Sequence, residues 1–344
     1  MLTIPRKAIE ALIFILAIAN LGLACYLALV MNSPLKDPAA SGKNVFIEKG
    51  QSLRGIARGL KKEQVIKSDG AFRLSYSLYF SPRFLRAGEY RFEPPLTPKR
   101  IMLQMISGQI MLHPITIPEG LTFTEISALL EEKAFPYQGS FLDTCRRVEL
   151  VSDLDPKADN LEGYLFPETY RFARGVEAIE LVKAMIEQFR KNFGPEDLAR
   201  AGRLNLTVRE IVTLASLIEK ETSKEEEKPL VSAVFHNRLR LGMKLDCDPT
   251  IIYALKLQGR FDGNLRLKDK SLASPYNTYL YRGLPPGPIC NPGRASLQAA
   301  LHPAPVDYLY FVSRNDGSHV FNRSYQEHLR AVSKYQLKNH RNLR

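Results

Sequence analysis

The sequence lacks the residue spacings that hold metals or redox-active disulfides. Its six histidines form no HxxxH or HExxH pattern, and its four cysteines form no CxxC pair. We therefore predict no metal and no cofactor. It also lacks finger-type Cys/His spacing and the interleaved aromatic and basic residues of a single-strand stacking platform. Nucleic acid is therefore not an expected partner.

What the chain has in excess is positive charge. Over 344 residues the formal net charge is +12, with 45% hydrophobic and 24% charged residues. These proportions are ordinary for a globular protein, and the length allows one large or two modest domains with a core. The charge favours an anionic partner, such as a membrane surface or an acidic polymer.

An uncharged apolar stretch occupies residues 11–31. As a helix it is long enough to cross a hydrocarbon core of roughly 30 Å. Arg6 and Lys7 precede it, so we expect residues 1–10 to be a cytoplasmic tail and the chain beyond residue 31 to be exported. This pattern predicts a single-pass inner-membrane protein whose larger part is periplasmic.

A retained anchor has two alternatives. A cleaved signal peptide usually has a shorter apolar region. A lipoprotein would use Cys25 in "LGLAC", but the apolar residue stands one position too far from that cysteine. Cys145, Cys247 and Cys290 would be exported, an odd number that is compatible with one disulfide and a leftover thiol but defines no framework.

Two related segments follow an expected linker at residues 32–44, "NSPLKDPAASGKN". They are "FIEKGQSLRGIARGLKKEQVI" and, 70 residues later, "TIPEGLTFTEISALLEEKAFP". Each predicts a short strand, a glycine turn, a hydroxyl N-cap and an amphipathic helix. The pattern resembles LysM wall-binding units, although two βα units can share it by chance. The matched pairs are Ile47 and Ile117, Gly50 and Gly120, Ser52 and Thr122, Ile56 and Ile126, and Leu60 and Leu130.

Other signals place further elements along the chain. A helix is expected to begin near Thr97 with Pro98 at its first position. From about Val176 the chain is predicted to be helical, and Thr207 and Glu210 form a capping box for the helix that ends in "EKET". Beyond it, "SPYNTYLYRGLPPGPICNPG" is either a dispensable loop or a rigid wall for a ligand, followed by a helix and the strand "DYLYFVSR".

The two glutamates of "EKET", Glu219 and Glu221, raise the question of a catalytic carboxyl group. At about 100° per residue they lie on opposite edges of the buried stripe, about 200° apart, so at most one can face a scissile bond. Lys220 points away from the stripe. A helical wheel does not decide which of the two glutamates is catalytic. The alternative to a catalytic role is an ordinary solvated helix end. The expected buried stripe consists of Ile211, Leu214, Ala215 and Ile218.

Five motifs together resemble the YceG-like family of endolytic murein transglycosylases. They are "EGYLFPETY", "EKET", "FHNRLRLGMKLDCDPTIIYAL", "SPYNTYLYRGLPPGPICNPG" and "ALHPAPVDYLYFV", in order over about residues 160–328. The resemblance implies that Glu221 is the catalytic residue. The implied reaction is nonhydrolytic cleavage of the MurNAc-GlcNAc bond of nascent peptidoglycan, which leaves 1,6-anhydroMurNAc ends and sets strand length. A single glutamate suffices, because the sugar's own 6-hydroxyl is the nucleophile.

The same resemblance suggests the residues around the substrate. Tyr276, Tyr279 and Tyr281 offer flat surfaces for sugar rings. Arg238 could equally be a structural ion-pair donor. "DCDPT" is expected to be a turn before a helix near Thr250 and not a metal site. If Cys247 and Cys290 paired, they would tie this turn to the proline-rich segment. The expected substrate-binding residues are Asn237, Arg238, Asp248, Thr250, Tyr276, Asn277, Thr278 and Tyr279.

The expected fold is α+β: a transmembrane helix, a LysM-like βα region at 45–112, and a mixed α+β catalytic domain at 113–344 with a second LysM-like motif at about 116–136. The expected partners are peptidoglycan glycan strands and the membrane, and the resemblance adds glycan polymerases and transpeptidases. Two other functions stay open. One is a noncatalytic wall-binding scaffold, and the other is a hydrolase that uses Asp246 or Asp248 as its second carboxylate.

Overall fold

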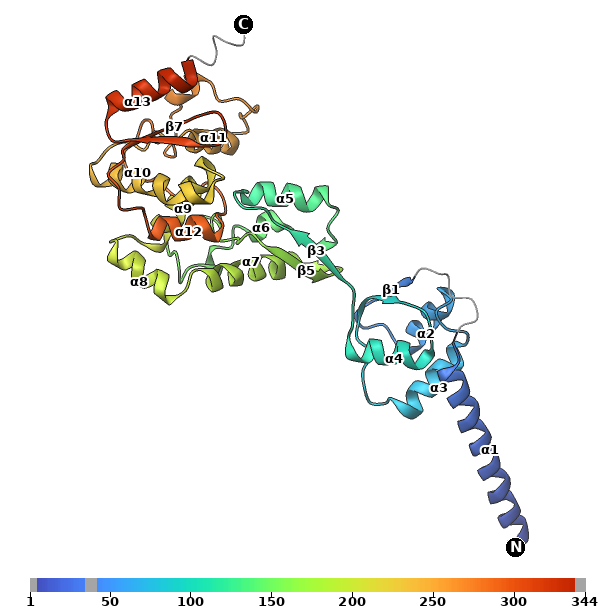
Figure 1. Cartoon of the computed structure of the whole chain (residues 1–344). Helices are drawn as coiled ribbons and strands as arrows, with labels where there is room; N and C mark the ends of the chain where they lie inside the picture. Colours follow the sequence, from blue (N-terminus) through green and yellow to red (C-terminus); the bar gives the residue numbers. More distant parts are fainter. Residues whose placement is uncertain (1–4, 35–41, 338–344) are drawn as a thin grey trace. The chain divides into compact units, whose positions relative to one another are not determined.

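The computed structural model describes residues 5–34 and 42–337, which divide into two units (Figure 1). The first comprises the described residues up to His113 together with Arg171–Arg174. The second comprises Pro114–Tyr170 and the described residues from Gly175 onward. Both mix helices with short strands, which confirms the α+β class. Most of the expected linker, residues 35–41, lies outside the described residues.

The apolar N-terminal stretch forms one helix, α1 (Arg6–Asn32). It is long and apolar enough to cross a membrane, and it is the one such helix in the described part of the chain. Only 6% of its most apolar window is buried inside the protein. Its surface therefore suits a hydrocarbon environment, in agreement with the expected anchor.

The first unit is built on an antiparallel pair of strands with two helices between them. The strands run in register from Lys43 opposite Phe92 to Ile47 opposite Gly88. Tyr90 and Phe92 stack in the core with ring centroids 5.7 Å apart. After α1, its elements are β1 (Lys43–Ile47), α2 (Leu53–Lys62), α3 (Asp69–Tyr79), β2 (Gly88–Phe92) and α4 (Pro98–Ser107).

The repeated strand-turn-helix pattern is present at both places in the chain. Gly50 and Gly120 have φ angles of 81° and 76°, in the left-handed region that glycine adopts without strain. Ser52 caps α2 and Thr122 caps α5 (Phe123–Glu132), each accepting a hydrogen bond from a backbone N–H of the first helical turn. The paired isoleucines and leucines of both helices are buried. The local prediction is confirmed, and the LysM likeness itself stays a prediction.

The second unit surrounds one buried helix, α9 (Val208–Glu221), which contacts α8, α10, α11 and α12. All residues from Ile211 to Ile218 are buried, so the expected apolar stripe is correct but too narrow. The strands form two-stranded pairs, β3 with β5, β4 with β6 and β7 with β8. The strands β3 (Leu112–Thr116) and β5 (Thr169–Ala173) each have residues in both units. The other elements are β4 (Tyr137–Gln138), α6 (Phe141–Thr144), β6 (Val176–Glu177), α7 (Ala178–Asn192), α8 (Pro195–Arg203), α10 (Lys228–Arg240), α11 (Asp248–Leu257), α12 (Arg294–Leu301), β7 (Tyr310–Ser313), β8 (His319–Asn322) and α13 (Tyr325–Val332).

The predicted helix starts are confirmed where a side chain caps the helix. Thr97 accepts from the N–H of Arg100 at 3.2 Å, with Pro98 at the first position of α4. At α9, Thr207 Oγ1 accepts from Glu210 N at 3.2 Å, and the Glu210 carboxylate accepts from Thr207 N at 2.8 Å. This reciprocal capping box fixes where α9 begins and hence where its last turn presents the two glutamates.

Candidate active site

The end of α9 places Glu219 and Glu221 in different surroundings. The helix ends at Glu221, and Thr222 is already extended. Both residues are half-buried, and the side chain of Glu219 is 8% exposed. The two carboxyl groups point in different directions from the helix and therefore have different neighbours.

Glu219 is held by three partners. Both of its oxygens accept from Lys228 Nζ at 3.3 Å, and Lys228 is only 3% exposed. Its Oε2 also accepts from Gly293 N at 3.0 Å and from Ser296 Oγ at 2.7 Å. The carboxylate thus ties α9 to the starts of α10 and α12. A group with these contacts is suited to holding helices together.

Glu221 has the properties of an acid that stays protonated near neutral pH. Burial of its carboxyl group raises its pKa to about 7, and the negative charge of Asp248 acts in the same direction. A hydrogen bond from the Cys247 thiol and the positive charges of His319 and Arg238 partly oppose this rise. The residue as a whole is half-buried, and these neighbours surround its carboxyl group.

Asp248, Tyr279 and Lys270 form a polar cluster beside Glu221. Tyr279 donates its hydroxyl hydrogen to Asp248 Oδ1 at 2.7 Å, and Lys270 Nζ lies 3.3 Å from the same oxygen. Lys270 also donates to the Tyr279 hydroxyl at 2.9 Å and lies 4.3 Å from the centre of its ring. Asp248 and Tyr279 were both expected near the substrate, and the structure brings them together. Lys270 was not expected.

Thr250 and Thr278 are buried beneath this cluster. Their hydroxyl oxygens lie 3.0 Å apart, Thr250 donates to the carbonyl of Cys247 at 2.7 Å, and Thr278 accepts from Cys247 N at 3.0 Å. In "DCDPT", Asp246 and Cys247 have no regular structure, and Asp246 has a φ angle of 51°. Helix α11 begins at Asp248, two residues earlier than predicted. The two threonines thus position Cys247 against Glu221.

Asn237 and Arg238 bond mainly to the backbone near β7. Asn237 donates to the carbonyls of Val306 at 2.9 Å and Tyr308 at 3.0 Å. Arg238 is 8% exposed and donates to the carbonyl of Leu309 at 2.7 Å and to the Asp246 carboxylate at 3.0 Å. The alternative of a structural Arg238 fits these contacts. A direct contact of either side chain with a sugar stays a prediction.

Asn277 bonds to the backbone of the Asp248 cluster, whereas Tyr276 lines a different pocket. Asn277 is fully buried and donates to the carbonyls of Lys270 at 3.1 Å and Leu272 at 2.8 Å, so it shapes the loop. Tyr276 packs on Tyr253 with ring centroids 4.9 Å apart and lines a small pocket with Glu162 and Arg209. A sugar contact by Asn277 or Tyr276 is a prediction that these positions do not favour.

The proline-rich segment follows α9 along its length. The carbonyl of Pro286 accepts from Arg209 Nε at 2.7 Å near the start of α9, Ile289 N donates to Ser216 Oγ at 3.0 Å, and Gly293 N reaches Glu219 at its end. The segment is therefore fixed along α9 and is not a dispensable loop, and its role as a wall for a ligand stays a prediction.

"EGYLFPETY" is fixed to the same segment by Asn291. Asn291 Oδ1 accepts from Gly163 N and Leu165 N, both at 2.9 Å, and its Nδ2 donates to Glu162 Oε1 at 2.9 Å. A Cβ on Gly163 would lie 2.6 Å from Pro288 Cγ, and Gly163 has a φ angle of 89°, so a larger residue is excluded twice over. Burial raises the pKa of Glu162 to about 8. These contacts explain the motif by packing.

His319 is the neighbour of Glu221 that the sequence did not reveal. Its Nδ1 lies 2.6 Å from Glu227 Oε2, and its backbone N–H donates to Glu227 Oε1 at 2.9 Å. Thr222 donates to the same carboxylate at 3.3 Å. Glu227 thereby holds His319 where its charge acts on Glu221. Glu227 belongs to the charged run "KEEEK", whose composition is typical of solvated surface, but its side chain is only 10% exposed.

The cysteines of the motif segments are unpaired. Cys247 and Cys290 are buried free thiols with separate partners, Glu221 for the former and the carbonyl of Ser216, at 3.4 Å, for the latter. The disulfide considered between them is not formed. In the described part of the chain, no three His, Cys, Asp or Glu residues lie together as a metal site would require.

Known proteins with this sequence pattern carry a common description. The model of the YceG-like family matches residues 45–334. A protein of Bacillus subtilis named endolytic murein transglycosylase is 33% identical over 318 residues, covering 88% of this chain and 87% of its own. A protein of the same name from Streptococcus pneumoniae is 29% identical, and the match covers 89% of this chain and 61% of that protein.

A solved structure agrees with the fold. A protein from Listeria monocytogenes described as YceG-like superposes with a TM-score of 0.57 at 30% identity, covering 84% of this chain and 98% of its own. The family match spans both units and includes the end of α9, "DCDPT" and the proline-rich segment along α9. The chain belongs to the YceG-like family.

Proposed function

We propose that the protein is a membrane-anchored endolytic peptidoglycan lytic transglycosylase. It cleaves the MurNAc-GlcNAc bond and leaves a 1,6-anhydroMurNAc end. The observation that carries this proposal is the contrast at the end of α9. Burial raises the pKa of Glu221 to about 7, whereas the Glu219 carboxylate is bound by Lys228, Gly293 and Ser296. The names of the bacterial relatives support the same activity.

The first chemical step needs the protonated form of Glu221. The carboxylic acid donates its proton to the glycosidic oxygen while the bond from that oxygen to MurNAc C1 breaks. GlcNAc leaves as the alcohol, and positive charge develops at C1. A pKa near 7 keeps about half of the Glu221 population protonated at neutral pH.

The second step uses the carboxylate that the first step produced. Glu221 removes the proton of the 6-hydroxyl of the same MurNAc, and that oxygen bonds to C1 to close the anhydro ring. Glu221 ends protonated, as it began, and no water is consumed. A second carboxylate to activate water is not needed, which distinguishes this reaction from hydrolysis by a carboxylate pair.

The neighbours of Glu221 adjust its acidity in opposite directions. The Cys247 hydrogen bond lowers the pKa and the Asp248 charge raises it. We therefore expect Cys247→Ala to shift the alkaline limb of the kcat/KM profile to higher pH, and Asp248→Asn to shift it to lower pH. The measurement is glycan cleavage from pH 5 to 9 by each variant and by the unaltered chain, whose limb should lie near pH 7. Limbs that stay in place, or that move in the same direction, would contradict this assignment.

The anchor would keep the enzyme where strands are made. With Arg6 and Lys7 on the cytoplasmic side, α1 leads the two units to the opposite face of the membrane. Cleavage close to the bilayer would set the length of nascent strands. The β1-α2-α3-β2 arrangement and the excess of basic residues support a LysM-like hold on the polymer by the first unit. Glycan polymerases and transpeptidases are its proposed neighbours.

The experiment that tests the activity is digestion of purified glycan strands followed by mass measurement of the fragments. A lytic transglycosylase gives new ends that are one water lighter than reducing ends. A hydrolase using Glu221 with Asp246 or Asp248 gives reducing ends, and a noncatalytic scaffold gives no fragments. Only the first result agrees with the proposal.

A further inference from the structure

The end of α1 is shared between the membrane and the first unit. Leu27 is 1% exposed and Met31 5% exposed, and Met31 belongs to the core of the unit. The apolar helix outside the unit is therefore residues 11–26, which span about 24 Å at 1.5 Å per residue. A hydrocarbon core is roughly 30 Å thick. An approach of the unit's surface beside α1 to the bilayer covers this difference.

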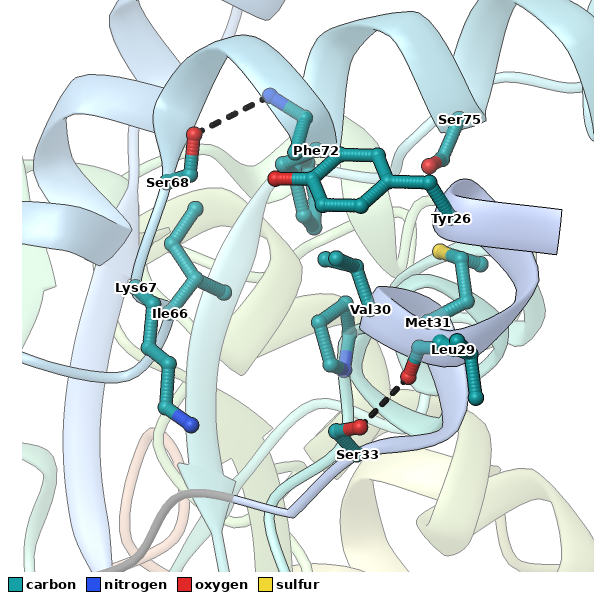
Figure 2. Close-up of a pocket in the computed structure, with 12 residues that line it drawn as sticks. Tyr26, Leu29, Val30, Met31, Ser33, Ile66, Lys67, Ser68, Phe72 and Ser75 are labelled. Atoms are coloured by element: carbon teal, nitrogen blue, oxygen red, sulfur yellow. Dashed lines mark hydrogen bonds between the residues drawn. The ribbon is translucent and has the colours of Figure 1, made fainter. Parts of the chain in front are cut away.

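Helix α3 lies on this surface, next to the end of α1 (Figure 1). Between the two helices is a cavity of about 300 Å³, and Figure 2 shows Tyr26 and Val30 of α1 facing Phe72 and Ser75 of α3 across it. Ser75 is fully buried, and its hydroxyl has no hydrogen-bond partner among the described residues. The seam between the helices is thus mainly apolar.

The exposed apolar side chains of α3 flank the side that faces α1. Leu74 and Leu78 are 40% and 58% exposed. They follow the cavity-lining residues Ala71 and Ser75 by three positions, which places them within about 60° of the α1 side of the helix. A water-facing helix carries polar residues at such positions.

The end of α3 and the loop that follows it carry exposed aromatic and basic residues. Tyr79 is 53% exposed and Phe84 is 84% exposed, and Arg83 and Arg86, on either side of Phe84, are exposed as well. Residues 67–88 contain four basic residues and one acidic residue. Aromatic rings and arginines of this kind are typical of the membrane-water interface, and basic side chains there attract anionic headgroups.

We infer that Leu74, Leu78, Tyr79, Arg83, Phe84 and Arg86, here called the α3 surface, lie in the headgroup region of the bilayer that α1 crosses. The inference rests on the membrane anchor of the proposed function. The partner is the phospholipid bilayer, with the apolar side chains about 5–10 Å into the boundary of headgroups and acyl chains and the two arginines on anionic headgroups. These contacts hold the first unit against the membrane and restrict its motion relative to the bilayer.

The absence of tryptophan from the chain allows a direct test. Three single variants of the full-length protein are reconstituted in vesicles of phosphatidylcholine and phosphatidylglycerol: F84W on the α3 surface, L267W in the second unit, and L16W in α1. Phe84 and Leu267 are both 84% exposed, so L267W is a matched control. Lipids brominated at known acyl positions then quench each tryptophan according to its depth.

The inference predicts blue-shifted emission of F84W with strong quenching by bromines near the headgroups, deep quenching of L16W, and water-like, unquenched emission of L267W. Deep quenching of L16W with unquenched F84W would overturn the α3 surface and leave the anchor intact. Unquenched L16W would overturn the anchor and the inference with it. Equal quenching of F84W and L267W would contradict a specific surface, and emission of F84W that is blue-shifted but unquenched would indicate a protein partner instead.

Discussion

Glu221→Gln is expected to reduce glycan cleavage about a thousandfold or more while leaving the protein folded. One side chain performs both proton transfers in the proposed reaction, and general acid-base groups contribute roughly 10²- to 10⁴-fold each. Glutamine keeps the shape of the carboxylic acid but cannot donate a proton to an oxygen that is leaving. The measurement is kcat/KM on purified glycan strands, with thermal unfolding of the same preparation.

The variant should also lose the pH dependence of stability that Glu221 introduces. Its folded pKa of about 7 lies above the ordinary value of 4.5, so the folded state binds the proton more tightly than the unfolded state. That contribution is present at low pH and is lost as the pH rises through about 7. The free energy of unfolding of Glu221→Gln minus that of the unaltered chain should therefore be larger at pH 8 than at pH 4. Full activity in this variant would contradict the assignment of Glu221.

Glu219→Gln is expected to give the opposite result, a stability defect of about 3 kcal/mol with cleavage retained by the folded fraction. The substitution leaves Lys228, which is 3% exposed, without its main counter-charge. Removing one partner of a buried ion pair costs about 3–5 kcal/mol. Glu119 lies 3.9 Å from Lys228 and offsets part of the loss, which places the expectation at the lower end.

The readout for Glu219→Gln is the melting temperature, with a fall of roughly 6–12 °C for a unit of this size. The control is Glu221→Gln, the same substitution two residues away in the same helix. A general effect of altering α9 therefore cannot explain a difference between the two variants. Loss of activity without loss of stability in Glu219→Gln would reverse the roles assigned to the two glutamates.

Local signals in the sequence predicted local structure well. Thr97 and Thr207 stand where helices begin, because an N-cap needs only residues three positions apart. Gly50 and Gly120 mark turns for a similar reason, since their left-handed backbone depends on the residue itself. Helix α3 was not anticipated, although Ser68 caps it and Asp69 stands in its first turn, so the same rule would have found it.

The choice between the two glutamates depended on distant contacts. Glu219 is fixed by Gly293 and Ser296, 74 and 77 residues away, and His319 is held beside Glu221 by Glu227, 92 residues away. A helical wheel contains none of these partners. The wheel did identify the four core positions correctly, but it could not show that α9 is enclosed by four other helices and buried nearly all round.

Residue types alone also suggested more sugar contacts than the geometry favours. Asn277 has the donors and acceptors of a sugar-binding residue, but its amide holds the carbonyls of Lys270 and Leu272. Arg238 likewise serves backbone carbonyls near β7. A buried polar side chain must satisfy its own hydrogen bonds first, and the sequence does not show whether those partners are protein or ligand.

The source of the oxygen at the new chain end tests the central claim most directly. Glycan strands are digested in water enriched in heavy oxygen, and the fragments are weighed. If Glu221 directs the sugar's own 6-hydroxyl to C1, the new ends contain no heavy oxygen and the Glu221→Gln variant yields no fragments. One heavy oxygen atom at each new end would show that water is the nucleophile and would contradict the account.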